Sequence, residues 1–416
     1  MVSSMRFAAR NEPFGMTIYD KHAGQIFVLR GVNDLKDGKV VLQEGERKME
    51  VRPEEIDFIQ TVVERNDILV GPTYVEIYPT VTCNERCKFC YMGEVLTYKP
   101  TGMPKEVVDA IAVQLRNVGV YQASILGGEP FLYNDLEYLM SKLSDAGINV
   151  SVSTNGTVLN KALFRKLTDM NVRLNFSFHS HIPEVHDMIT NMKGGFALSL
   201  KTLEFLRSID HPPHISIVAN SVNINHLSET VDFVCRTGGV TAISVYHAMK
   251  SGFARSGEPD IGVGFSEYVR AFKLAEEKGK EYGVKVRVVT NFPFLADQSL
   301  AFDRNLGELA NFFYGAVDGR SAVYINYDGT VYSSSYQFGA KELAMGNVLK
   351  EDLRYMWNSS PAVEQFRTAS PPAQCSACEH FDICRGGPIS NYAPTFLRKS
   401  QDEHMSCPLK DASRAE

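Results

Sequence analysis

The chain lacks the long apolar runs that membrane proteins and secreted precursors carry. No stretch among its 416 residues approaches the roughly 20 consecutive apolar residues of a membrane-spanning helix. The segment 1–16 contains Arg6, Arg10 and Glu12 but no apolar run of signal-peptide length. These absences predict a cytoplasmic protein without a membrane partner.

A strong excess of charge of either sign is also missing. The 43 Lys and Arg residues and the 49 Asp and Glu residues give a net charge of −6. Because surfaces that bind nucleic acid or anionic membranes are basic, this balance argues against either as the main partner. Hydrophobic residues make up 44% and charged residues 22%, as in soluble globular proteins, and the length suggests two or three domains.

Cysteine is sparse and unevenly placed. Three of the eight residues lie within 83–90, four lie within 375–407, and Cys235 stands alone. A cytoplasmic chain keeps its thiols reduced, so we expect no disulfides. Grouping of this kind indicates metal binding.

The early group reads Cys83-x3-Cys87-x2-Cys90. Three thiolates can hold an iron–sulfur cluster while leaving one iron without a protein ligand, and that iron can bind a substrate or cofactor. An open coordination position distinguishes a catalytic metal site from a structural one. From the triplet alone, a zinc site or three unrelated buried thiols are the alternatives.

Apolar strands and amphipathic helices alternate between residues 74 and 289. The helical stretches carry apolar residues at three- and four-residue spacing, as in 107–115 and 136–143. This alternation predicts a parallel sheet covered by helices, either open or closed into a barrel. The expected strands are 75–78, 123–126, 150–153, 174–178, 215–219, 243–246 and 286–289.

Polar segments follow the first four of these strands. They are the cysteine loop, the Gly-Gly-Glu-Pro sequence at 127–130, the Ser-Thr-Asn-Gly sequence at 153–156, and Ser177. Ligands of parallel α/β folds bind beyond the carboxyl ends of the strands, so these segments should share one rim. Paired glycines allow close backbone approach, and serine and asparagine offer neutral hydrogen-bonding groups.

The cysteine spacing and these segments resemble the radical S-adenosylmethionine (radical SAM) enzymes. The resemblance implies a partial (β/α)6 barrel and a 4Fe-4S cluster on Cys83, Cys87 and Cys90. The open iron would bind SAM, and an electron from a flavodoxin- or ferredoxin-type donor would cleave it to a 5′-deoxyadenosyl radical. Glu129 would add negative charge beside the methionyl ammonium group. The implied SAM-binding residues are Phe89, Gly127, Gly128, Glu129, Pro130, Ser153, Asn155 and Ser177.

The fourth strand departs from the family pattern. Many relatives have Ser-x-Asp-Gly where this chain has Ser-Phe-His-Ser at 177–180, and Thr190 stands where an arginine is often found. Histidine titrates near neutrality, so His179, His181 and His186 could form a proton relay. The alternative is that they only support the site or are exposed.

Residues 1–72 predict a small β-rich unit that packs on the rest of the chain. Hairpins are expected at 15–29 and 40–51, followed by a short helix that begins at Pro53 and places Ile56 and Ile59 on one face. The unit loosely resembles the winged-helix module with which peptide-modifying relatives grip a leader peptide. Its role is therefore either peptide recognition or structural support.

Residues 296–416 contain a hairpin at 322–332 and a closed set of thiols. Four thiolates suit zinc or iron equally on spacing alone. The segment resembles the SPASM extension of radical SAM enzymes, which carries auxiliary 4Fe-4S clusters. The positions that would supply the first auxiliary cluster hold Ser333-Ser334, Tyr314-Gly315 and Pro388, so the resemblance implies one auxiliary cluster. Its ligands would be Cys375, Cys378, Cys384 and Cys407.

We therefore expect three domains, at 1–72, 73–295 and 296–416, and an enzyme that abstracts hydrogen from a peptide or protein. The alternatives are a radical dehydrogenase or epimerase of a small molecule such as an aminoglycoside, and an iron–sulfur electron carrier. Cys235 is either a small core residue or a hydrogen-atom donor. The sequence names no catalytic side chain.

Overall fold

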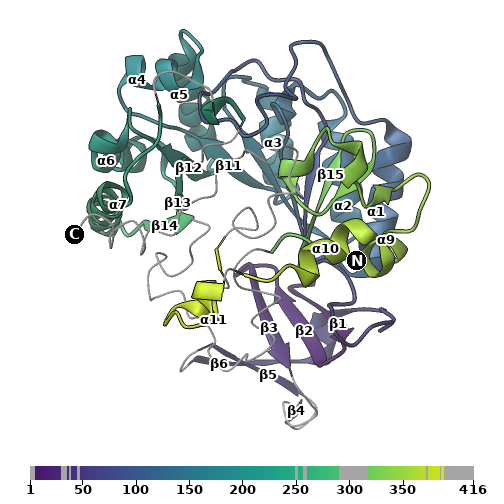
Figure 1. Ribbon diagram of the computed structural model, residues 1–416. Coiled ribbons are helices and arrows are strands. Elements are labelled where there is room, and N and C mark those ends of the chain that lie inside the picture. Colours follow the sequence, from purple (N-terminus) through teal and green to yellow (C-terminus); the bar gives the residue numbers. More distant parts are fainter. Residues whose placement is uncertain are drawn as a thin grey trace.

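The computed structural model describes residues 5–29, 35–36, 39–44, 47–248, 252–255, 260–289, 317–371, 373–384 and 386–387. In this part of the chain the strands form three sheets: one of four strands, one of three and one of ten. The two small sheets come from the N-terminal segment and lie below the large sheet in Figure 1.

The N-terminal unit contains both predicted hairpins. Its four-stranded sheet has the order β3-β2-β1-β7, and its three-stranded sheet has the order β4-β5-β6. Only β1 and β7 pair in parallel; the other neighbours are antiparallel. The bounds are β1 Phe7–Glu12, β2 Gly15–Asp20, β3 Gln25–Leu29, β4 Leu35–Lys36, β5 Lys39–Glu44, β6 Arg47–Val51 and β7 Ile56–Ile59.

The prediction of a helix that begins at Pro53 is wrong. Pro53–Glu55 forms a single 3-10 turn, and the chain then continues as strand β7. Ile56 and Ile59 are buried as expected, but Phe58 between them is 42% exposed. Parallel pairing with β1 satisfies the backbone of this segment, so tertiary contacts override the helical spacing of its apolar residues.

The predicted alternation of strands and helices is confirmed. Strands β8 to β14 are all parallel, in the order β14-β13-β12-β11-β10-β9-β8, and helices cover one face of the curved sheet (Figure 1). The strands are β8 Tyr74–Tyr78, β9 Gln122–Ile125, β10 Asn149–Thr154, β11 Arg173–Ser177, β12 His214–Ala219, β13 Ala242–His247 and β14 Lys285–Val289. The helices are α1 Lys105–Val118, α2 Leu136–Asp145, α3 Lys161–Asp169, α4 Pro183–Thr190, α5 Gly195–Ser208, α6 Leu227–Gly238 and α7 Phe265–Glu281.

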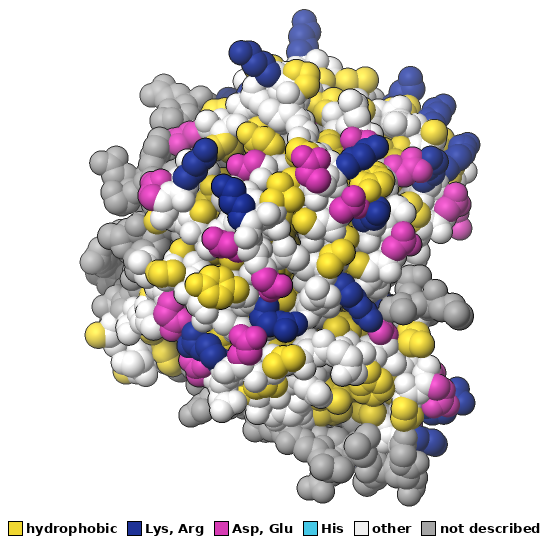
Figure 2. All heavy atoms as spheres, turned by 90° about the vertical axis from the view of Figure 1, so that its right-hand side faces the viewer, with side chains coloured by type: hydrophobic (Ala, Val, Ile, Leu, Met, Phe, Trp, Pro, Cys, Tyr) yellow, Lys and Arg dark blue, Asp and Glu magenta, His cyan; other side chains and the backbone are white. Residues whose placement is uncertain are grey.

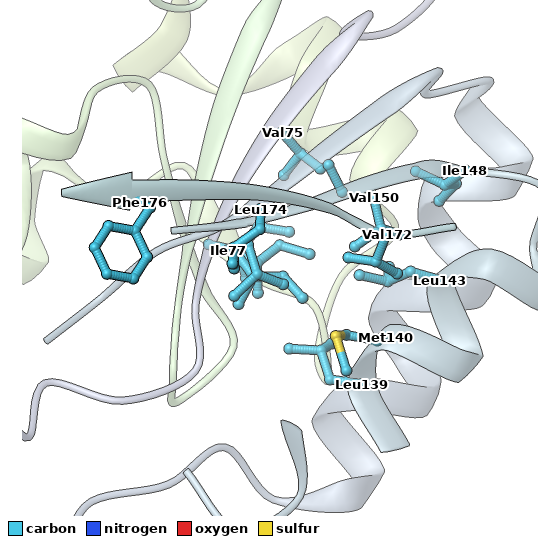
Figure 3. Packing of buried hydrophobic residues seen from close by; sticks show 14 of the residues in the cluster. Val75, Ile77, Leu139, Met140, Leu143, Ile148, Val150, Val172, Leu174 and Phe176 are labelled. Carbon is cyan, nitrogen blue, oxygen red and sulfur yellow. The ribbon is translucent and has the colours of Figure 1, made fainter. Parts of the chain in front are cut away.

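The two faces of this sheet differ in chemistry. Val75, Ile77 and Leu174 point into the main core, where they meet Leu139 and Leu143 of α2 (Figure 3). Because side chains alternate along a strand, the neighbouring residues face the other way. That inner face is polar, and it presents Glu76, Ser124, Ser151, Asn175, Ser216 and Tyr246.

The predicted C-terminal hairpin also forms, and it joins the main sheet. Strand β15 Ala322–Asn326 pairs in parallel with β8, and β16 Thr330–Tyr332 and β17 Gly346–Asn347 extend the sheet as antiparallel strands. The sequence pattern of alternating strands and helices ends after residue 289 and did not predict that β15 joins the main sheet. The described residues that follow contain the helices α9 Leu353–Ser359, α10 Pro361–Thr368 and α11 Phe381–Cys384.

Candidate radical SAM site

The four predicted polar segments follow β8, β9, β10 and β11 at their carboxyl ends and meet at one rim. Backbone hydrogen bonds fasten the first two together: the Gly128 amide donates to the Thr80 carbonyl at 2.9 Å, and the Glu129 amide donates to the Thr82 carbonyl at 2.8 Å. The loop after β9 is thereby held against the start of the cysteine loop. The expected convergence of these segments is present.

The glycines at 127 and 128 are required by the chain itself. A Cβ atom on Gly127 would overlap the Thr80 carbonyl oxygen, and one on Gly128 would overlap that of Thr82. Gly127 also has φ of +133°, which a side chain disfavours. The close backbone approach that we predicted for a ligand is therefore used first between two loops of the protein.

Helix α4 supports the cysteine loop from the other side. The Arg86 amide donates to the Thr190 carbonyl at 3.2 Å, and the Lys88 amide donates to the Ile189 carbonyl at 2.9 Å. These carbonyls belong to the last turn of α4, where no helical amide is left to bond them. The loop thus completes the helix end while the helix fixes the loop.

The three thiols of this loop are enclosed. Cys83 is 8% exposed, and burial, followed by the charge of Glu129, raises its pKa to about 12. Burial likewise raises the pKa of Cys90 to about 11 and that of Cys87 well above its usual range. Without metal, the thiols are protonated at neutral pH, so loading a cluster must release protons.

Glu85 is a buried group in this loop that sequence reasoning missed. It is 3% exposed, and its Oε2 atom accepts a hydrogen bond from the Cys87 thiol at 3.2 Å. Its Oε1 atom has no partner. Three sulfur donors and an unsatisfied oxygen enclosed in one loop form a polar site that fits an iron–sulfur cluster. Within the described residues, no three His, Cys, Asp or Glu side chains are grouped closely enough for a single metal ion.

Glu129 is buried and its carboxylate is held by the protein. It accepts hydrogen bonds from the Thr154 hydroxyl at 2.7 Å, the Asn155 amide at 2.8 Å and the Phe131 amide at 3.0 Å. Burial raises its pKa to about 7 against these donors. The structure thus adds a positioning role for Glu129, which ties the second loop to the third; a role toward the SAM ammonium group stays a prediction.

Asn155 joins the third loop to the cysteine loop. Its Nδ2 atom donates to Oδ1 of Asn84 at 3.0 Å, and its Oδ1 atom accepts from the Thr157 hydroxyl at 2.7 Å. The remaining predicted SAM-binding residues lie on the same rim: Ser153 near the end of β10, Ser177 at the end of β11, and Pro130 at the start of a buried 3-10 turn.

Phe89 belongs to the cysteine loop, and its side chain contacts the fourth loop. Its ring meets the His179 ring edge-on at 4.8 Å, and it packs against a small apolar cluster of Ala248, Ala254 and Ile261. Phe89 therefore forms part of the apolar wall of the site.

Two of the three histidines are buried and neutral. Burial lowers the pKa of His179 to about 3 and that of His186 to about 4. His179 accepts a hydrogen bond from the Val218 amide at 3.2 Å, and His186 stacks on Phe178. Both rings are therefore neutral at pH 7, and a part in proton transfer stays a prediction. His181 contacts the Thr230 hydroxyl at 3.2 Å on α6.

Three of the four late cysteines lie in the described part of the chain. The Cys378 amide donates to the Cys375 carbonyl at 3.0 Å, and Cys384 ends the short helix α11, where it is 8% exposed. Cys407, like Tyr314-Gly315 and Pro388, lies outside the described residues. Ser333 and Ser334, which stand at a missing cysteine position, are fully buried.

Cys235 lies on α6 in the layer of helices that covers the outer face of the sheet. It is partly buried and packs against the main hydrophobic core. This position agrees with a small core residue. It does not bring the thiol to the inner face or to the rim.

Comparison with protein families identifies two domains. Residues 77–234 match the radical SAM superfamily, and residues 317–379 match the SPASM iron–sulfur cluster-binding domain. The first match spans the cysteine loop and the other three rim segments. The chain therefore contains a radical SAM domain and a SPASM domain, and the predicted cofactors, iron–sulfur clusters and SAM, are those of these domains.

The chain is similar in sequence to proteins of known name. The chain is 25% identical to an AdoMet-dependent heme synthase of Methanosarcina barkeri, over 76% of this chain and 91% of that protein. It is 26% identical to the mycofactocin maturase MftC of Mycolicibacterium smegmatis, over 74% and 76% of the two chains. Streptococcus suis SuiB, solved with its precursor peptide SuiA, superposes with a TM-score of 0.75 at 16% identity, over 97% of this chain and 98% of that chain. The SuiB likeness establishes the fold alone.

No helix in the described ranges is long and apolar enough to cross a membrane. On the molecular face shown in Figure 2, Lys and Arg side chains are interspersed with Asp and Glu side chains.

Proposed function

We propose that this protein is an enzyme that modifies a ribosomally made peptide by abstracting a hydrogen atom from an unactivated carbon. The similarity to MftC and to the SuiB structure with its precursor peptide supports a peptide substrate. The observation that carries the proposal is the rim itself, where the cysteine loop is locked to the segments predicted to bind SAM.

Cys83, Cys87 and Cys90 would hold the 4Fe-4S cluster, and SAM bound to it supplies the 5′-deoxyadenosyl radical that removes the hydrogen atom. The chain's own residues position that cofactor. Glu129 and Asn155 fix the loops on which SAM would lie, and Phe89 and the buried ring of His179 shield one side from water. Shielding matters because a carbon radical must meet the substrate before other reactants.

The domain boundaries that we propose are 1–72, 73–295 and 296–416. The N-terminal unit is fixed to the barrel by Arg10, which is buried and donates hydrogen bonds to the carbonyls of Val118 and Gly119 in the barrel and of Gly71 and Pro72 at the end of the unit. We assign this unit to recognition of the leader region of the peptide. If deleting residues 1–59 left the affinity for the full-length peptide unchanged, this assignment would be wrong.

The C-terminal domain would hold one auxiliary 4Fe-4S cluster on Cys375, Cys378, Cys384 and Cys407. With four protein thiolates the cluster is closed, so it would transfer electrons or stabilise the fold without binding substrate. We further propose a cytoplasmic location, where a flavodoxin- or ferredoxin-type donor can reduce the clusters.

The decisive experiment is anaerobic incubation of the reconstituted protein with reductant, SAM and candidate peptides deuterated at carbon. We expect deuterium in 5′-deoxyadenosine and a mass change in the peptide. The matched controls are Cys87→Ala, which should abolish both signals, and Cys235→Ala, which should preserve both. Absence of 5′-deoxyadenosine would favour an electron carrier. Deuterium transfer only from a small molecule, such as a porphyrin or an aminoglycoside, would favour the alternative substrate class.

A further inference from the structure

Strand β8 places a carboxylate on the polar inner face of the sheet, outside the cysteine loop and the rim. Glu76 lies between Val75 and Ile77, whose side chains enter the core (Figure 3). Its own side chain therefore points to the opposite face, toward the interior of the partial barrel. Neither family resemblance nor cysteine spacing singled out this residue.

Two tyrosines of the same strand hold this carboxylate. The Tyr74 hydroxyl donates to Oε1 of Glu76 at 3.1 Å, and the Tyr78 hydroxyl donates to Oε2 at 2.5 Å. The Tyr78 hydroxyl also lies 2.7 Å from that of Tyr91, the residue after Cys90. A continuous row of hydrogen-bonding groups thus leads from Glu76 to the cysteine loop.

The C-terminal domain brings a second carboxylate to the same place. Strand β15 pairs with β8 so that Tyr324 stands opposite Glu76, and Tyr324 is hydrogen-bonded to Asp318. The negative charge of Asp318 disfavours ionisation of Glu76. Among the described residues no Lys or Arg forms an ion pair with Glu76.

The opposite wall of the partial barrel supplies Tyr246 of β13. It is 38% exposed although it lies on the inner face, and it hydrogen-bonds to Ser216 and Ser244. Burial, and to a smaller extent the charge of Glu76, raises the pKa of Tyr246. The titratable groups that face Glu76 are therefore Tyr74, Tyr78, Tyr91, Tyr246, Asp318 and Tyr324.

Keeping a carboxylate ionised in such a position costs free energy. Removing an ionised group from water without a cation disfavours its charged form, and here burial raises the pKa of Glu76 to about 7. An ionised carboxylate has about four lone-pair directions, and the two tyrosines use two of them. Glu76 therefore has a lone pair left to accept a proton from a substrate on the inner face. It can keep that proton at neutral pH.

We propose that Glu76 accepts the proton which the substrate releases after hydrogen abstraction, while Tyr74 and Tyr78 hold its carboxylate in place. This inference rests on the proposed function. A carbon radical beside an X–H group becomes a C=X double bond when it loses one electron and one proton. An oxidised iron–sulfur cluster, where the C-terminal cysteines hold one, would take the electron, and the proton passes from X to Glu76, which becomes a neutral carboxylic acid.

The test compares Glu76→Gln with Glu106→Gln, a change of an exposed glutamate in the first turn of α1. In Glu76→Gln we expect deuterium transfer to 5′-deoxyadenosine to persist while peptide product falls by about 100-fold or more, as for loss of a general base. The rise of product formation with pH near 7 should also disappear. Glu106→Gln should behave as the wild type. Product within threefold of the wild-type rate, or equal loss of deuterium transfer and product, would overturn the assignment.

A second readout needs neither SAM nor substrate. Infrared difference spectra of the full-length protein, with glutamate isotopically labelled, should show a protonated carboxyl that ionises near pH 7 and is missing in Glu76→Gln. Absence of that change would refute the inference even if both variants fold and the peptide is modified. If no peptide yields deuterium with the wild type, the proposed function fails while the spectroscopic result on Glu76 still stands.

Discussion

The hydroxyl of Thr154 donates a hydrogen bond to the carboxylate of Glu129 at 2.7 Å, across the ends of two neighbouring strands. Glu129 begins the 3-10 turn after β9, and Thr154 is the last residue of β10. The contact turns two separate strand ends into one rigid rim. The site therefore depends on Glu129 as an acceptor within the protein.

Replacement of Glu129 by glutamine tests this role. The amide group of glutamine would set an N–H against one of the donors that the carboxylate accepts, so the rim should loosen. We expect affinity for SAM to fall by about 10- to 100-fold, equivalent to about 1.4–3 kcal/mol, while Cys83, Cys87 and Cys90 still take up iron. Calorimetry measures the affinity for SAM, and iron analysis of the same sample measures the iron content. Wild-type SAM affinity would contradict the prediction.

Substitution of Gly128 by alanine should disturb the junction between the second loop and the cysteine loop. The new methyl group would overlap the Thr82 carbonyl, which is backbone and has little freedom to move. We expect loss of SAM binding and a lower iron content. Gly264→Ala is the matched control, because nothing lies within 4 Å of its added Cβ and its φ is −60°. Equal behaviour of the two variants would count against the packing argument.

Arg10→Met should detach the N-terminal unit from the barrel. Arg10 forms a fully buried ion pair with Glu12 at 2.7 Å, and removing one member of such a pair typically costs about 3–5 kcal/mol. Thermal unfolding of the variant should therefore begin at a lower temperature. The double variant Arg10→Met, Glu12→Gln should recover part of the loss, since it removes the unpaired charge. A double variant no more stable than the single one would show that the backbone contacts of Arg10 dominate.

The free energy of unfolding should depend on pH through Glu76, and the sign of this dependence follows from its raised pKa. Because the pKa of Glu76 is about 7 when folded and lower when unfolded, the folded state binds the extra proton between about pH 4.5 and 7. Stability from this group is therefore lost as the pH rises through that window. Glu76→Gln should remove that loss, so the difference in unfolding free energy between variant and wild type should grow by about 1–3 kcal/mol from pH 5 to pH 8. A difference that is independent of pH would contradict it.

Iron content distinguishes the two metal sites. The wild type should bind about eight iron atoms per chain, from two four-iron clusters. Cys378→Ala should reduce this to about four, and it should leave the electron paramagnetic resonance response to SAM in place. Four irons together with one zinc in the wild type would show that the late cysteines hold zinc. A folded Cys378→Ala protein with full turnover would show that the auxiliary cluster has no part in the reaction.

Local patterns accounted for much of this molecule. The spacing of apolar residues between Val107 and Leu143 marked two helices, and the order of strands and polar segments placed the rim correctly. The apolar spacing of Ile56 and Ile59 misled, because parallel pairing with β1 outweighs a short helix. Strand β15 pairs with β8, which lies more than 240 residues earlier in the sequence. The local signals of a hairpin do not indicate which distant strand it will pair with.

The sequence by itself indicated the cofactor class, because the three thiols in one loop and the polar segments after the next three strands together resemble the radical SAM pattern, and none of these motifs depends on a distant contact. Only the tertiary structure decided which groups surround that loop. The fold makes Glu129 an acceptor for Thr154. It also places the charge of Asp318 where it raises the pKa of Glu76, and the charge of Glu76 where it raises the pKa of Tyr246. Burial and neighbouring charge set the proton affinity of these carboxylates, and both depend on the fold as a whole.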